Sequence, residues 1–139
     1  MVNLITGPKG SGKTQQMIEL ANEAVKTTDG NVVLIKKSHK ETLSVDFNIR
    51  AICMTDYTNI KKVDEFVGFL YGMVAGNSDI EVIFIDSILK QADITLENLP
   101  AFIDALKKIS ADHKVEMYIS VSAKQDEMVG VDFSDCKIL

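Results

Sequence analysis

The residues best suited to chemistry follow a short apolar stretch near the start of the chain and precede an amphipathic one. They match the spacing G-x-x-x-x-G-K-[ST] at every fixed position: Gly7, Pro8, Lys9, Gly10, Ser11, Gly12, Lys13 and Thr14. Glycines allow a backbone to wrap closely around a phosphate group and to point its N–H groups at the oxygens. Lys13 is predicted to neutralise phosphate charge in catalysis, and Thr14 to offer a hydroxyl to Mg²⁺. The segment therefore predicts a phosphate-binding loop.

A carboxylate that could share this metal ion stands at the end of a second apolar run. The run 82–85 reads Val-Ile-Phe-Ile and is followed by Asp86. A strand buried on both faces has this composition, and an aspartate at its end can hold a water of Mg²⁺ beside Thr14. The alternative is that Asp86 caps the turn formed by residues 87–89.

Few residues could orient the water that hydrolysis requires. Asp56 follows the stretch 50–55 and is the candidate base, with an ordinary turn aspartate as the alternative. Glu41, in the polar stretch after the second strand, is a weaker candidate. Arg50 is the one arginine of the chain and could act as a finger toward a neighbouring molecule, although it stands at the start of a strand. The sequence thus supports binding better than it supports turnover.

Alternating strand-like and helix-like segments must position these residues. Hydrophobic periodicity predicts strands at 2–6, 32–35, 50–55, 82–85 and 115–121, helices at 13–27, 62–75 and about 98–110, and a candidate edge strand within 129–139. This alternation predicts a three-layer α/β domain with a mostly parallel sheet of about five strands. One domain is expected to span residues 1–139. Ligands of such sheets bind beyond the carboxyl ends of the strands.

Composition narrows the expected partners and compartment. The chain has 139 residues, with 15 Lys plus Arg against 20 Asp plus Glu, and a net charge of −5. Proteins that grip nucleic acid usually carry a basic surplus, so nucleic acid is not the expected partner. No apolar run approaches about 18 residues, so no membrane span is expected. Cys53 and Cys136 have no partners at metal-ligand spacing. A soluble cytoplasmic protein is predicted.

The loop and the strand that ends in Asp86 together resemble the Walker A and Walker B motifs of P-loop NTPases, over about residues 2–122. The element order is similar to that of the RecA-like and type II thymidine kinase branch, in which another strand separates the two motif strands. The chain looks closer still to short bacterial P-loop ATP-binding proteins whose role is not established, some of them labelled twitching-motility ATPase. The resemblance implies ATP and Mg²⁺ as ligands.

Departures from better-known relatives restrict the activity. GTPases carry D-x-x-G after the Walker B strand, and thymidine kinases of this branch carry a glutamate as base; here Ser87 follows Asp86. The guanine motif N-K-x-D does not occur, which favours ATP over GTP. Small nucleotide kinases close an arginine-rich lid, which a single arginine cannot build.

The sequence therefore predicts a Mg²⁺–ATP-binding protein whose hydrolysis is slow or depends on an unknown protein partner. Two alternatives stay open. A small-molecule kinase would need an acceptor pocket and a base, for which Asp56 is the candidate. A nucleotide-gated interaction module would bind ATP without useful turnover.

Overall fold

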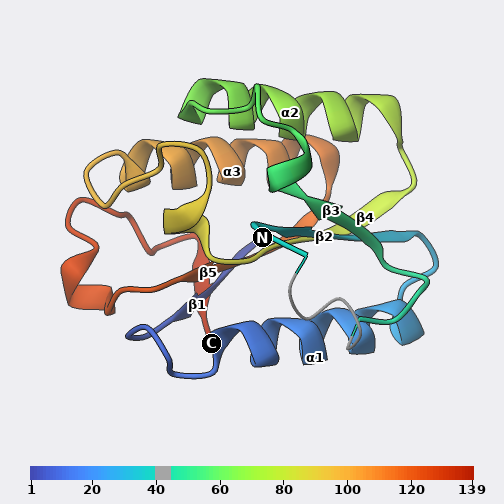
Figure 1. Cartoon of the computed structure of the whole chain (residues 1–139), viewed down its shortest axis with the longest axis horizontal. Helices are drawn as coiled ribbons and strands as arrows, with labels where there is room; N and C mark the ends of the chain where they lie inside the picture. The colour runs from blue at the N-terminus through green and yellow to red at the C-terminus, as the bar shows by residue number, and fades with distance from the viewer. Residues whose placement is uncertain (40–44) are drawn as a thin grey trace.

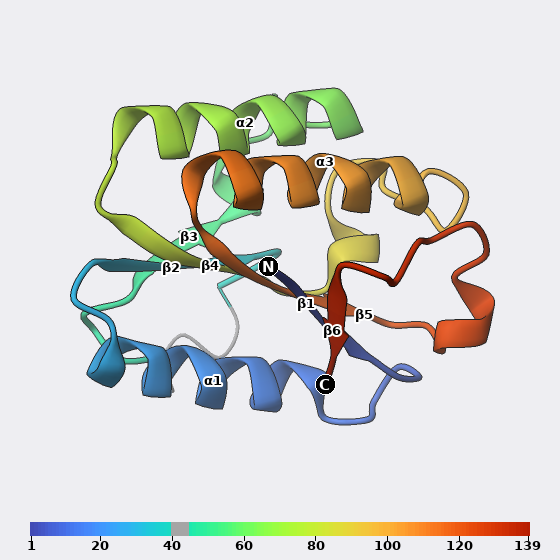
Figure 2. The ribbon, with the colours of Figure 1, turned by 180° about the vertical axis from the view of Figure 1, so that it is seen from behind.

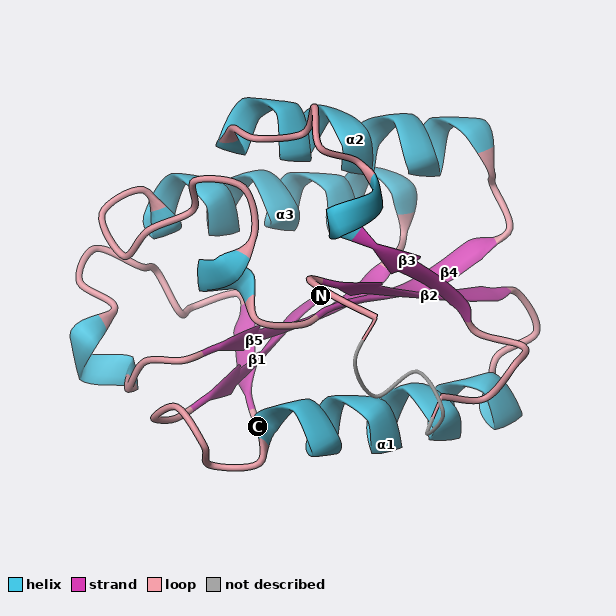
Figure 3. Ribbon diagram, in the orientation of Figure 1, coloured by secondary structure: helices cyan, strands magenta, loops and turns pink. Residues whose placement is uncertain are grey.

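The computed structural model describes residues 1–39 and 45–139, and these form an alternating series of strands and helices (Figures 1 and 3). The strands are β1 (Val2–Thr6), β2 (Asn31–Lys36), β3 (Arg50–Cys53), β4 (Ile80–Ile85), β5 (Glu116–Val121) and β6 (Cys136–Ile138). The α-helices are α1 (Lys13–Thr27), α2 (Val63–Gly76) and α3 (Leu99–His113). Short 3₁₀ turns are η2 (Met54–Asp56), η3 (Ile88–Lys90) and η4 (Gln125–Glu127). Within these ranges, no helix has the length and apolarity to cross a bilayer.

The strands form one sheet in the order β3-β2-β4-β5-β1-β6, and every neighbouring pair is parallel. Helix α1 covers one face of the sheet, and α2 and α3 cover the other (Figures 1 and 2). This arrangement confirms the three-layer α/β prediction. Strand β5 lies between β1 and β4, so one strand separates the two strands that lead into the glycine-rich loop and Asp86.

Two details of the sheet differ from the prediction. The expected strand 50–55 is too long, because the N–H of Tyr57 donates to the carbonyl of Met54 and turns the chain into η2 after Cys53. The tail supplies a sixth strand, since β6 pairs with β1 from Val2 to Leu4. The candidate edge strand is therefore confirmed, and the sheet has one strand more than the five expected.

Strand β4 is buried on both faces, which explains its unbroken apolar run. Ile83 and Ile85 pack toward the cluster beneath α2 and α3, whereas Val82 and Phe84 pack toward α1. Phe66 of α2 and Phe102 of α3 meet edge to face, with ring centroids 5.9 Å apart. Both faces of the sheet are thus covered by apolar helix surfaces, and the carboxyl ends of the strands are fixed relative to one another.

Helix α3 ends on a residue whose backbone conformation favours glycine. Lys114 has φ 55° and ψ 46°, and its N–H donates to the carbonyl of Ser110. Side chains other than glycine rarely adopt this left-handed conformation at a helix end. Lys114→Gly is therefore expected to raise the free energy of unfolding by about 0.5–1 kcal/mol, measured by urea denaturation. Lys108→Gly, inside the same helix, should lower it by about 1 kcal/mol, and equal effects of the two changes would contradict this account.

Candidate functional site

The glycine-rich loop joins the end of β1 to the start of α1. It is anchored by the N–H of Gly7, which donates to the carbonyl of Ala123 at 2.9 Å, just beyond the end of β5. Gly10 and Gly12 have φ of 83° and 85°, a region that non-glycine residues rarely occupy. A Cβ atom at Gly7 would lie 2.9 Å from the Oγ of Ser11. The backbone conformation of the loop therefore favours glycine at these three positions.

Lys13 opens helix α1, and its ammonium turns back into the loop. Its Nζ donates to the carbonyls of Gly7 at 3.0 Å and Pro8 at 2.8 Å, and to the Oγ of Ser11 at 3.3 Å. The residue is only 8% exposed. Burial lowers the pKa of Lys13 by removing water from the charge; Asp86 opposes this shift, and Lys90 adds to it. The ammonium is thus held where its donors can pass from loop oxygens to those of an anion.

Thr14 and Asp86 meet beside the loop, although 72 positions separate them in the chain. The Oγ1 of Thr14 donates to the Oδ2 of Asp86 at 3.0 Å, and the Oγ of Ser120 donates to Oδ1 at 2.7 Å. Both carboxylate oxygens are therefore held in place, and Asp86 is only 8% exposed. A hydroxyl and a carboxylate are hard oxygen donors of the kind that Mg²⁺ prefers.

A cavity of about 190 Å³ opens next to this pair. It is lined by residues of the loop helix, the end of β2 and the region after β4: Thr14, Lys36, Lys37, Ser38, Asp86, Ser87 and Lys90. Three of these side chains are lysines, so the cavity combines one carboxylate with positive charge. Such a lining suits an anion that carries a divalent cation, as a metal-bound polyphosphate does.

The other residues singled out from the sequence lie elsewhere. Asp56 follows β3, two strands from β4, and its carboxylate lies 2.9 Å from the Nε2 of His39. It does not line the cavity beside Thr14. Arg50 opens β3, at the end of the strand opposite Asp56. Lys9 is exposed in the loop. Glu41 lies outside the described residues.

Other residues that contribute to the site lie outside the two motifs. Ser120 lies in β5 and is a polar residue near the carboxyl end of an otherwise apolar alternation, but nothing in the sequence pairs it with Asp86. Lys36 is buried at the end of β2. A lysine that closes an apolar run at a carboxyl end is a usable signal for this position. Lys90 follows in η3, and only the fold brings it near Lys13.

Comparison with models of protein families found none that matches this chain, and comparison with curated proteins gave no match either.

Proposed function

We propose that this chain binds Mg²⁺–ATP with its loop Gly7–Thr14 and hydrolyses it slowly or only with a partner protein. One observation carries the proposal: Thr14 and Asp86 meet at 3.0 Å beside a loop whose carbonyls hold the ammonium of Lys13. These are the three side chains that the combined Walker motifs require to be neighbours. A cytoplasmic location belongs to the same proposal, because both cysteines are free thiols and ATP is abundant there.

Each element of the site has a defined task in this proposal. The N–H groups of the loop and of the first turn of α1 face the phosphates, where the positive end of the helix dipole favours anions. Lys13 shifts its donors from the carbonyls of Gly7 and Pro8 to phosphate oxygens. The oxygens of Thr14 and Asp86 would hold Mg²⁺, which offsets the negative charge of the phosphates. Ser120 keeps the carboxylate of Asp86 in its orientation.

Slow or partner-assisted hydrolysis is proposed because the residue after Asp86, at the end of β4, is not a base. Ser87 occupies the position of the expected base, and its N–H donates to the Oγ of Ser120 at 2.6 Å. Asp56 is engaged by His39, two strands from β4. Lys90 and Lys36 bring positive charge to the cavity, which favours binding of phosphate. A protonated lysine has no lone pair to accept a proton from an attacking water, so these residues account for affinity better than for rapid hydrolysis.

The serine at position 87 also supports the second candidate, an interaction module without turnover. Ser87 stands where a catalytic base is expected, so the site can bind ATP without hydrolysing it. The kinase alternative gains no such support. Its candidate base, Asp56, is absent from the lining of the cavity beside Thr14 and is bonded to His39.

Equilibrium binding and single-turnover hydrolysis, with ATP and GTP compared, test the proposal. We expect Mg²⁺-dependent binding of ATP, weaker binding of GTP, and hydrolysis at roughly 10⁻⁴ to 10⁻² s⁻¹, the range of P-loop proteins that act without an added arginine. Turnover at background with intact binding would favour the interaction module. If ATP does not bind at millimolar concentration with Mg²⁺ present, the proposal is wrong.

A further inference from the structure

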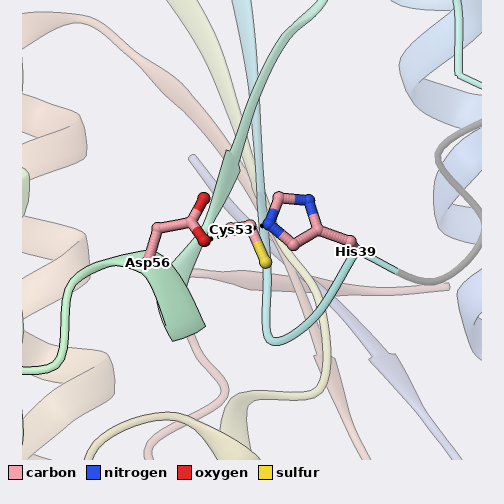
Figure 4. A group of neighbouring side chains, drawn as sticks. All are labelled: His39, Cys53 and Asp56. Carbon is pink, nitrogen blue, oxygen red and sulfur yellow. Dashed lines mark hydrogen bonds and ion pairs between the residues drawn. The ribbon is translucent and has the colours of Figure 1, made fainter.

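A second group of reactive side chains meets at the ends of β2 and β3, apart from the cavity beside Thr14. His39, Cys53 and Asp56 each offer one ligand atom, and these three atoms all lie within 4.8 Å of one another. Figure 4 shows the imidazole, the thiol and the carboxylate converging from two strand ends and the turn η2. We propose that this group is a binding site for one transition-metal ion of the Zn²⁺ class.

The pairing of two parallel strands creates the group. In the register of β2 with β3, Lys36 lies opposite Cys53. After β2 the chain continues to His39. After β3 the turn η2 brings Asp56 back beside this histidine. The histidine is separated in sequence from the cysteine and the aspartate, so no ligand spacing could reveal the site. Cys53 has no partner at metal-ligand spacing in the sequence, and it is the fold that brings the ligand atoms of His39 and Asp56 near its sulfur.

The donor set selects a particular class of ion. Imidazole nitrogen, thiolate sulfur and carboxylate oxygen suit Zn²⁺ and its neighbours, whereas Mg²⁺ takes oxygen donors. With bonds of about 2.0–2.3 Å, the ligand atoms of a tetrahedral Zn²⁺ site lie roughly 3.3–3.6 Å apart. Here the Nε2 of His39 and the Oδ1 of Asp56 are 2.9 Å apart, and every separation stays within 4.8 Å. Closing the set around an ion would therefore change these separations by about 1 Å or less.

The surroundings of Cys53 fit a metal-bound sulfur. Its side chain is buried, and its Sγ lies 3.1 Å from the Oγ1 of Thr55. The thiol also donates to the carbonyl of Lys37 at 3.6 Å, a bond that is given up when the thiol loses its proton. The Thr55 hydroxyl can donate to a thiolate and orient it, as outer-shell partners do at metal sites. The side chains of His39 and Asp56 are 66% and 52% exposed. An ion can therefore enter from solvent, and a water molecule can fill a fourth position.

Charge and proton balance shape the expected behaviour. The side chains of Lys36 and Lys37 line the neighbouring cavity, and their charge opposes a cation. Affinity must therefore come from the sulfur bond. When Cys53 binds the ion, its S–H bond breaks, the S–metal bond forms and the proton leaves to solvent. The Nε2 of His39 must bind through its lone pair, so its hydrogen bond to Asp56 is replaced.

Cobalt titration of the full chain, kept reduced and freed of metal by a chelator, tests the site. We expect one equivalent of Co²⁺ to give thiolate-to-cobalt charge-transfer absorption, which Zn²⁺ abolishes and excess Mg²⁺ does not. Cys53→Ser should remove the absorption, and His39→Gln should weaken Zn²⁺ binding more than about a hundredfold, beyond the usual effect of an outer-shell partner. The matched controls are Cys136→Ser and His113→Gln, which should change neither result.

Other outcomes would overturn the site. These are absence of charge-transfer absorption at one equivalent, its loss in Cys136→Ser, or equal Zn²⁺ affinity in the wild type, His39→Gln and Asp56→Asn. Because His39 and Asp56 are exposed, their variants should fold even if Cys53→Ser, at a buried position, does not. No nucleotide is used, so failure here would leave the proposed ATP site untouched.

Discussion

Replacing Lys13 with alanine is expected to weaken ATP binding by at least about a hundredfold. Hydrogen bonds to charged groups contribute about 1.5–3 kcal/mol each, and two bonds to phosphate oxygens would already account for a factor of this size. The buried ammonium has loop carbonyls as partners and stands at the first residue of α1, so its donors already point into the loop. Isothermal titration calorimetry with Mg²⁺–ATP measures the change.

Two further substitutions test whether the position of the Lys13 ammonium matters, and not only the presence of a positive charge. Lys26→Ala removes a lysine from the same helix, where it is 69% exposed and pairs with Glu23 at 3.7 Å. This control should leave ATP affinity within about twofold, because exposed charges far from a site are screened by salt. Lys13→Arg keeps the charge but replaces a compact ammonium with a planar guanidinium whose donors lie in a fixed fork, so the affinity for ATP should fall here too. Full affinity in either Lys13 variant would contradict the assigned role.

The position of the loop was predictable because its sequence pattern is local. Glycines that the backbone requires, a lysine and a threonine follow one another directly between a strand and a helix, so residues 7–14 carry the whole pattern. The position of Asp86 was predictable for a related reason. A strand buried on both faces is an unbroken apolar run, and the first charged residue after the run marks its end. The layers of the fold followed from the same periodicity, and the sixth strand followed only weakly from a short, mostly polar tail.

What could not be predicted depends on which strands become neighbours. Ser120 reaches Asp86 only because β5 lies next to β4 in the sheet. His39 meets Cys53 and Asp56 only because β2 lies next to β3 in one particular register. Asp56 was considered as a base on the strength of its position after a strand. In the fold that strand is at the edge of the sheet, which places the carboxylate away from the cavity.

Asp86→Asn is expected to remove most of the gain in ATP affinity that Mg²⁺ provides. The substitution keeps the size of the side chain and one acceptor oxygen, so the bond from either Thr14 or Ser120 can survive. It removes the negative charge that would hold the ion. Coupling between two ligands is typically about 1–3 kcal/mol, or about 5–150-fold in affinity. Titrations of ATP with Mg²⁺ and with EDTA give the ratio of the two affinities, which should fall from a value in this range in the wild type to about twofold or less in Asp86→Asn.

Ser120→Ala provides the control for a merely structural effect. It removes the hydroxyl that holds Oδ1 but leaves the carboxylate charge of Asp86, so the Mg²⁺ effect should fall less than it does in Asp86→Asn. Equal losses in Ser120→Ala and Asp86→Asn would show that orientation, rather than charge, determines metal binding. An unchanged Mg²⁺ effect in Asp86→Asn would place the ion elsewhere.

A double-mutant cycle with Thr14→Val then tests whether Thr14 and Asp86 serve one ion. Valine keeps the branched shape of threonine and removes its hydroxyl. If both oxygens hold the same Mg²⁺, either substitution alone already removes much of the benefit, and the double variant should lose clearly less than the sum of the two single losses. Residues in contact commonly show such coupling, at about 0.5–3 kcal/mol. Additive losses would mean that the 3.0 Å bond between Thr14 and Asp86 supports the loop without forming a metal site.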